Sequence, residues 1–335
     1  MTFNRVGRFA SVMLVSAVIL AACSSGGATT PVPSATQGGT ASQAAASPAE
    51  SQAATKLKIG VTFPILDQFL QTVADGMQAK ADELGVELVI VAAQEKTDVQ
   101  LGQVENFISQ KVDAIVVIPV DTDAAGPMTA AAQTATIPIV YVNRRPSDLP
   151  AGVPYVGSDS LYAGTVEMEA LAKLVNGKGN VVILQGDPAN EAAILRTQGC
   201  NDVVKKNPGM TVTKTQAGNW YRDKGLSIME NWIQTGEKID VVCANNDEMA
   251  LGAIQALKNA KLLDKVVVGG VDATADALAA MKAGDLEVTV FQDAKGQGGG
   301  GIDAAVKLAK GEKVPDLIDI PYQLVTPANM ADFMK

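Results

Sequence analysis

The chain has 335 residues, of which 47% are hydrophobic, and carries a formal net charge of -9. This length allows two domains with separate cores. The negative charge argues against nucleic acid or an anionic membrane surface as the main partner. Because the sequence contains no histidine, His-based catalytic triads, His-ligated metals and imidazole proton shuttles are excluded.

The first 23 residues have the pattern of an export signal. Arg5 and Arg8 precede an apolar stretch at 9–20, and the segment closes with Leu-Ala-Ala-Cys at 20–23. This tetrapeptide resembles the bacterial lipobox, in which the cysteine is acylated and becomes the mature N-terminus. We therefore expect a lipoprotein signal peptide over 1–23, a lipid on Cys23 and an extracytoplasmic protein tied to the cell membrane. A plain cleavage site with an incidental cysteine is the alternative.

Residues 24–55 consist almost entirely of Ser, Ala, Thr, Gly, Pro and Gln. A segment of this composition buries too little apolar surface to fold alone. We expect it to be a disordered tether.

From residue 57 onward, apolar segments alternate with amphipathic ones. In the first half we predict strands at 57–63, 86–92, 114–119, 138–142 and 154–156, with helices at 69–84, 99–110 and 124–135. In the second half we predict strands at 180–184, 211–215, 239–244, 266–271 and 286–291, helices at 163–174, 191–206, 224–234, 247–260, 273–282 and 296–310, and an extended segment at 318–325. Such alternation predicts right-handed βαβ units and parallel sheets, and its restart predicts two doubly wound α/β domains that face each other.

Polar side chains follow several of the predicted strands at the point where each strand ends. They are Asp67, Asn143, Arg144, Asn246, Asp272 and Gln292. The carboxyl ends of parallel strands meet at one edge of a sheet, where ligands bind, so these groups are expected to line a cleft. Each of them alone is better explained by a helix cap or by a loop hydrogen bond. A cap is the role we expect for the segment Asp121-Thr122-Asp123 and for Asp247.

Two aromatic residues are expected near the same cleft. Phe69 and Trp220 could cover the apolar faces of a sugar ring. Asn246 both donates and accepts hydrogen bonds, which suits a neutral hydroxylated ligand better than an ion.

Over about residues 57–330, the chain resembles the ribose/galactose-type periplasmic binding proteins of ABC importers. The resemblance is carried by Asn-Asn-Asp-Glu-Met-Ala-Leu-Gly at 245–252 and Val-Gly-Gly-Val-Asp at 268–272. Within that family it is most similar to inositol- and rhizopine-binding proteins, on segments 141–146, 269–273, 290–293 and 323–329.

The resemblance implies a type I periplasmic binding protein fold, with two doubly wound parallel-sheet lobes. The N-terminal lobe would comprise 57–158 with 293–320, and the C-terminal lobe 159–292 with 321–335. Three crossovers would join the lobes, near 157–159, 292–294 and 320–322.

The resemblance also implies a function. A monosaccharide or inositol-like cyclic polyol would be captured between the lobes and delivered to a membrane permease, by a monomer that is no enzyme and needs no cofactor or metal. The positions that match the family's sugar contacts are Asp67, Phe69, Asn143, Arg144, Trp220, Asn246, Asp272 and Gln292.

Two positions depart from the family pattern. Ile118 stands where an Asn is usual, and Ile194 where an Arg is usual. We interpret Arg196, two residues further on, as a structural residue that points elsewhere on its helix. A more apolar side of the pocket is then expected. With less positive charge beside Asp67 and Asp272, an amino-substituted polyol becomes a hypothesis next to a neutral one.

Other functions fit the residues less well. Asp67 and Asp272 could in principle perform acid/base chemistry on glycosides, but no activated nucleophile accompanies them. The Gly-rich run at 296–301 lacks the Lys-Ser/Thr of a phosphate loop, so close helix packing is the preferred interpretation. A helix-turn-helix regulator does not fit the N-terminus. A sugar or signal sensor that feeds a chemoreceptor or sensor kinase stays open as an alternative.

Two cysteines remain after Cys23. Cys243 falls in a predicted core strand and Cys200 on a predicted helix. We expect two buried thiols in preference to a disulfide.

Overall fold

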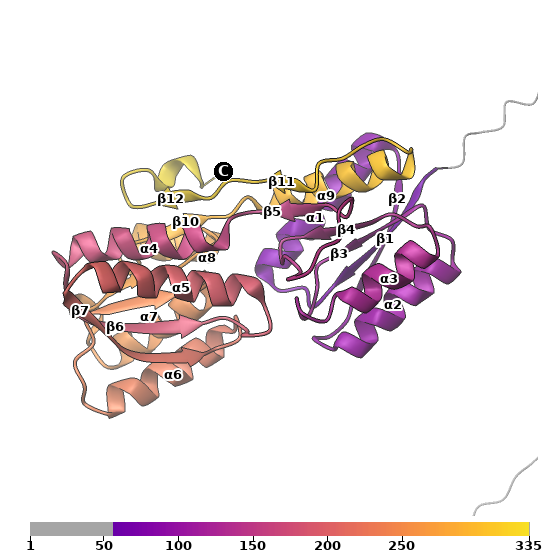
Figure 1. Cartoon of the computed structure of the whole chain (residues 1–335). Helices are drawn as coiled ribbons and strands as arrows, with labels where there is room; N and C mark the ends of the chain where they lie inside the picture. The colour runs from indigo at the N-terminus through magenta and orange to yellow at the C-terminus, as the bar shows by residue number, and fades with distance from the viewer. Residues whose placement is uncertain (1–55, 335) are drawn as a thin grey trace, which may run out of the picture. The chain divides into compact units, whose positions relative to one another are not determined.

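The computed structural model describes residues 56–334. The predicted signal peptide, the lipid on Cys23 and the tether at 24–55 lie outside the described residues. Within 56–334, parallel sheets alternate with helices along the chain, as the sequence predicts (Figure 1). No helix of this part of the chain has both the length and the apolar character that a bilayer crossing requires.

The first half of the chain, joined by β11 from near the C-terminal end, builds a six-stranded sheet, in the order β11-β5-β4-β3-β1-β2, in which every neighbouring pair is parallel. Its strands are β1 (Lys58–Phe63), β2 (Glu87–Ala92), β3 (Ala114–Val117), β4 (Ile139–Val142), β5 (Tyr155–Gly157) and β11 (Leu317–Asp319). Helices α1 (Gln68–Leu84) and α9 (Ala294–Ala309) cover one face, and α2 (Thr97–Ser109) and α3 (Gly126–Thr134) the other (Figure 1). We call this sheet with its four helices the first lobe.

The second half builds a four-stranded parallel sheet in the order β7-β6-β8-β9. Its strands are β6 (Lys178–Gln185), β7 (Gly209–Ala217), β8 (Val241–Ala244) and β9 (Val267–Gly269), and β10 (Thr289–Phe291) pairs antiparallel with β12 (Gln323–Val325) beside it. Its helices are α4 (Ser160–Leu174), α5 (Glu191–Lys206), α6 (Arg222–Gln234), α7 (Asp247–Asn259) and α8 (Ala275–Ala283), with 3-10 turns at Leu263–Lys265 and Met330–Asp332. We call this set the second lobe.

Three segments connect the two lobes, after β5, after β10 and after β11 (Figure 1). Hydrogen bonds tie them together: Ser158 Oγ donates to the carbonyl of Ile320, and Gln297 Nε2 donates to Ser158 Oγ at 2.9 Å. The extended segment predicted at 318–325 is therefore two strands, because the chain passes from a parallel edge position in one sheet to an antiparallel pair beside the other.

Close packing of α1 against α9 explains the Gly-rich run. A Cβ on Gly298 would lie 2.1 Å from the carbonyl oxygen of Val73, and one on Gly76 would lie 2.6 Å from the backbone of Lys295. Backbone meets backbone at these points, so side chains cannot be accommodated there. Helix packing, and not a phosphate loop, accounts for these glycines.

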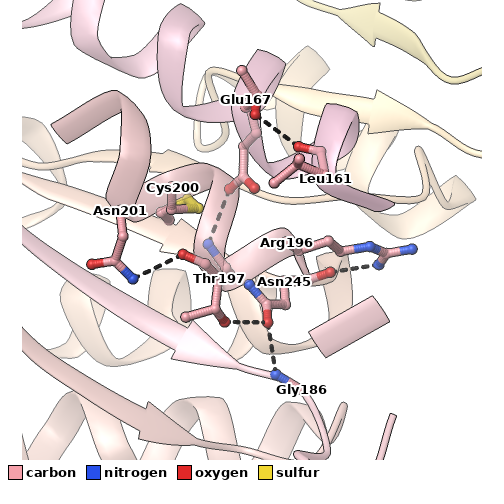
Figure 2. The surroundings of a disulfide bond; sticks show 11 residues. Leu161, Glu167, Gly186, Arg196, Thr197, Cys200, Asn201 and Asn245 are labelled. Atoms are coloured by element: carbon pink, nitrogen blue, oxygen red, sulfur yellow. Dashed lines mark hydrogen bonds between the residues drawn. A yellow bond between two sulfur atoms is a disulfide. The ribbon is translucent and has the colours of Figure 1, made fainter. Parts of the chain in front are cut away.

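The expectation of two free thiols is wrong. Cys200 on α5 and Cys243 on β8 are both fully buried, and they form a disulfide across 43 residues of sequence. Figure 2 shows that the same stretch of α5 also carries Arg196 and Thr197, which hydrogen-bond to Asn245 just after β8. Sequence could not pair the cysteines because the contact depends on which face of the sheet α5 covers.

Candidate functional site

A pocket lies where the carboxyl ends of the strands of both lobes meet. In parallel α/β sheets this edge is where ligands bind. All eight residues that the sequence predicted as sugar contacts line the pocket: Asp67, Phe69, Asn143, Arg144, Trp220, Asn246, Asp272 and Gln292. Leu70, Ala192, Arg196 and Glu248 line it as well.

Asp67 and Arg144 form the charged part of the first-lobe wall. Asp67 is the N-cap of α1 and accepts a hydrogen bond from the backbone N–H of Leu70 at 2.7 Å. Burial raises the pKa of Asp67, and the Leu70 N–H and Arg144 oppose that rise. Arg144 donates to the carbonyl of Pro119 at 3.2 Å. Burial lowers the pKa of Arg144, and Asp67 opposes the change, so each group favours the charged form of the other.

Asn143 lies between these groups and the interlobe connections. Its φ of +66° is a left-handed conformation that Asn tolerates better than most residues. Tyr155 Oη donates to its carbonyl at 2.8 Å, and its own Nδ2 donates to Gln297 Oε1 at 3.0 Å. The side-chain amide of Asn143 is therefore held in one orientation toward the pocket.

Arg196 organises the second-lobe wall: it points to a different side of α5 from the half-exposed Ile194, as we interpreted, but it also lines the pocket, which we did not expect. It is 4% exposed and donates to the carbonyl of Asn245 at 2.6 Å, to Gln292 Oε1 at 2.9 Å and to Tyr322 Oη at 2.7 Å. Its Nη1 lies 3.9 Å from Asp272 Oδ1. These partners follow β8, β9 and β10 or precede β12, so their convergence on one guanidinium is decided by the tertiary fold.

Asp272 is a buried carboxyl next to another buried carboxyl. Burial raises its pKa well above the usual range; Arg196 opposes that rise, and Asp247 adds to it. Asp247 is not the cap of α7, contrary to our expectation. It is fully buried and accepts from Thr289 Oγ1 at 2.7 Å and from the backbone N–H of Thr274 at 2.8 Å. Burial raises the pKa of Asp247 to about 7, against those hydrogen bonds.

Asn246 is the residue that caps α7. Its Oδ1 accepts from the N–H of Met249 at 3.1 Å, and its Nδ2 donates to the carbonyl of Trp220 at 3.2 Å. Trp220 has a φ of +72°. The Arg196 guanidinium carbon lies 5.7 Å from the centre of a Trp220 ring, within cation–π range. Asn246 therefore orders both a helix start and an aromatic wall.

Asp121, which we expected to cap a helix, does not cap α3. Asp121 accepts from the backbone N–H of Asp123 at 2.8 Å and forms a turn, whereas α3 begins after Ala125 with no side-chain cap.

The two isoleucines that depart from the family pattern lie away from the pocket. Ile118 is fully buried in the first-lobe core, and Ile194 is half exposed on α5. Neither lines the pocket, so the expected apolar side at these positions is wrong. Arg196 stands beside Asp272, and Arg144 acts on Asp67. Both carboxylates therefore have an arginine nearby, and the amino-substituted polyol stays a hypothesis for the ligand test.

The pocket combines carboxylates, amides and guanidinium groups with aromatic surface. Such a set donates to and accepts from hydroxyl groups, while Phe69 and Trp220 offer contact to apolar ring faces. In residues 56–334, one His/Cys/Asp/Glu group has the spacing of a metal site, namely Glu167, Cys200 and Cys243. It lies outside the pocket lining, and both its sulfurs are joined in the disulfide.

Comparisons with known proteins agree with this architecture. The family profile described as a periplasmic binding protein domain matches residues 59–313. A Rhizobium meliloti protein named for rhizopine binding is 47% identical over 291 residues, 84% of this chain and 94% of its own. A xylitol-binding protein of Mycolicibacterium smegmatis is 38% identical over 77% of this chain and 73% of its own.

A solved structure gives the corresponding likeness in three dimensions. An ABC transporter solute-binding protein from Bacillus halodurans with bound myo-inositol superposes with a TM-score of 0.81 at 44% identity. The match covers 83% of this chain and 97% of that one.

Proposed function

The chain belongs to the periplasmic binding protein family and has its type I fold, and from that premise we propose that it captures a neutral cyclic polyol, with myo-inositol the first candidate. The observation that carries the proposal is the pocket itself. Eight polar or aromatic side chains predicted from sequence meet there, and the buried Arg196 hydrogen-bonds to Gln292 and lies 3.9 Å from Asp272.

The relatives support the choice of ligand class. The solved structure with 44% identity holds myo-inositol, and the curated relatives are named for rhizopine and xylitol. The carboxylates of this pocket face arginines, so the site does not require a positively charged group on the ligand. A hydroxylated ring offers hydrogen bonds on its edge and apolar contact on its faces.

Capture would work by closure of the lobes. The moving parts would be 57–158 with 293–320 and 159–292 with 321–335, and the ligand would bridge Asp67, Asn143 and Arg144 to Trp220, Asn246 and Asp272. Such a bridge stabilises the closed arrangement by its higher affinity for it. A membrane permease of the ABC type would then take the ligand from the closed form.

Calorimetric titration of the purified chain tests the ligand class. The panel is myo-inositol, an inosamine, xylitol, ribose, xylose and glucose. We expect heat of binding with myo-inositol, no advantage for the inosamine and a rise in melting temperature that grows with ligand concentration. No binding of any polyol in the panel would refute the proposal, and preferential binding of the inosamine would refute a neutral ligand.

The membrane connection is a separate part of the proposal. The family places the protein outside the cytoplasm, and we propose a lipid on Cys23. Mass spectrometry of the mature N-terminal peptide, with Cys23→Ala as the control, checks it. An unmodified Cys23, or a wild-type protein that fractionates with the soluble proteins as the variant does, would refute the anchor.

Capture without chemistry is favoured over the alternatives. The relatives are solute-binding proteins, which supports a non-enzymatic role and does not favour the sensor. Release of sugar from glycosides by the purified chain would refute this reading.

A further inference from the structure

Asn190 touches both lobes at the point where they meet. It is fully buried and stands at the start of α5, and its Nδ2 donates to the carbonyl of Val120 in the first lobe at 2.8 Å. Next to it, the backbone N–H and the Oγ1 of Thr122 donate to the carbonyl of Ala189 at 3.0 and 3.1 Å. This set of hydrogen bonds joins the loop after β3 to the start of α5.

The side-chain oxygen of Asn190 binds Trp220, which lines the pocket. This atom, Oδ1, accepts from Trp220 Nε1 at 2.9 Å. Asn at a helix N-cap usually accepts from a backbone N–H of its own helix, but Asn190 makes no such side-chain cap bond. The amide is committed instead to the first lobe on one side and to Trp220 on the other.

The loop that carries the Val120 carbonyl is held by hydrogen bonds within the first lobe, one of them from a residue that lines the pocket. The buried side chain of Gln100 on α2 accepts from the N–H of Val120 at 2.8 Å and donates to the carbonyl of Ile118 at 2.9 Å. Arg144, which lines the pocket, donates to the intervening carbonyl of Pro119. The Val120 carbonyl is thus held in place relative to the first-lobe wall of the pocket.

Besides its bond to Asn190, Trp220 has contacts that stay within the second lobe. Its ring packs against Gly186, where a Cβ would lie 2.2 Å from the ring, and its carbonyl accepts from Asn246. Both of these partners belong to the second lobe. Asn190 differs because it binds Trp220 and the first lobe at the same time.

We propose that Asn190 is a positioning residue that couples lobe closure to the orientation of Trp220 in the pocket. It does not line the pocket. When the lobes are closed, the Val120 carbonyl fixes the Asn190 amide, and the fixed amide holds the indole ring over the ligand. When they open, the amide loses that anchor and the ring is less restrained. The role of Trp220 in covering a ligand rests on the proposed polyol binding, whereas the link from the first lobe through Asn190 to Trp220 does not.

The test uses the full chain with Trp232→Phe, because the chain has two tryptophans and Trp220 then emits alone. Asn190→Ala removes both hydrogen bonds, and Asn190→Asp keeps the acceptor for Trp220 but loses the donor to Val120. The matched control is Asn201→Ala, on the same helix, which loses a hydrogen bond to the carbonyl of Thr197. Melting temperatures verify that each variant folds.

Two measurements are made, one with ligand and one without. Acrylamide quenching of Trp220 without ligand is expected to rise in Asn190→Ala, which lacks the bond to the indole whether the lobes are open or closed, and not in Asn190→Asp or in the control. The Kd for myo-inositol is expected to rise about tenfold in Asn190→Ala and about fivefold in Asn190→Asp. In a Trp220→Phe background, measured by calorimetry, Asn190→Ala should have a clearly smaller effect, because the bond to the indole is already absent.

Three results would overturn the proposal. They are quenching in Asn190→Ala equal to that of the control, a Kd in Asn190→Asp equal to that of the parent, or an equal effect of Asn190→Ala with and without the indole. If the parent itself does not bind myo-inositol, the proposed ligand is refuted, and the Kd comparison is made with the sugar or polyol of the panel that the parent does bind.

Discussion

Replacement of Arg196 by methionine tests the assignment of the second-lobe wall most directly. Methionine keeps a long side chain and removes the guanidinium, which donates hydrogen bonds to Asn245, Gln292 and Tyr322. At about 1 kcal/mol net for each bond, the loss is about 3 kcal/mol. The variant also leaves the buried carboxyl of Asp272 without the positive charge that lies 3.9 Å away. We therefore expect the free energy of unfolding to fall by about 3–5 kcal/mol.

Urea denaturation at neutral pH measures this change, and calorimetry measures the ligand. The Kd for myo-inositol should rise at least about tenfold, because Gln292 and Asp272 lose the group that orients them. Asp272→Asn separates the two causes: in that background Arg196→Met should cost less, since no buried negative charge is left unpaired.

Arg145→Met is the matched control, since Arg145 is exposed and lies over the ring of Tyr155 at 5.8 Å. It should cost no more than about 1 kcal/mol. The reasoning would be refuted if Arg196→Met destabilised the chain no more than this control, or if Asp272→Asn left its cost unchanged.

Three further predictions concern neighbouring groups. Folding raises the pKa of Asp247 from 3.8 to about 7, so the stability that this group contributes is full below pH 3.8 and is lost as the pH rises through about 7. Between pH 5 and 8, the melting temperature of Asp247→Asn should therefore fall less than that of the wild type, and parallel curves would contradict this. Replacing Cys200 and Cys243 by serine frees a loop of 43 residues and should lower the free energy of unfolding by roughly 4 kcal/mol in urea denaturation; a loss below about 1 kcal/mol would show that the disulfide contributes little. Asn246→Ala removes the cap of α7 and the bond to the Trp220 carbonyl, and should cost about 1 kcal/mol of stability and weaken myo-inositol binding by a few kcal/mol at most; unchanged affinity would place the ligand away from this strand end.

The polar residues after each strand were accessible from sequence for a simple reason. The segment 241–244 is apolar throughout and is followed by short polar residues and then a helical pattern. This combination predicts a buried parallel strand that leads into a helix. Because such strands share one direction, their carboxyl ends share one edge. That Asp67 and Asn143 lie at one edge of the first-lobe sheet follows from this, whereas their meeting with Asn246 depends on how the two lobes pack.

Contacts between segments that are distant in sequence were not accessible in the same way. Asn246 and Asp247 are both suitable caps by composition, and only the packing of Asp247 against Thr289 decides which one serves. Arg196 has partners after β8 and β10 and before β12, none of which lies near it in sequence. Helix spacing correctly gave Arg196 a different direction from Ile194, but it could not show which groups Arg196 contacts.

The sequence by itself determined the alternation of strands and helices, the polar edge of each sheet and the family, because these follow from local periodicity and short motifs. The tertiary structure decided the Cys200–Cys243 disulfide, the central place of Arg196 and the double contact of Asn190. Each of these depends on which face of a sheet a helix covers and how the two lobes meet. That arrangement is fixed by the packing of the whole chain, and no single segment encodes it.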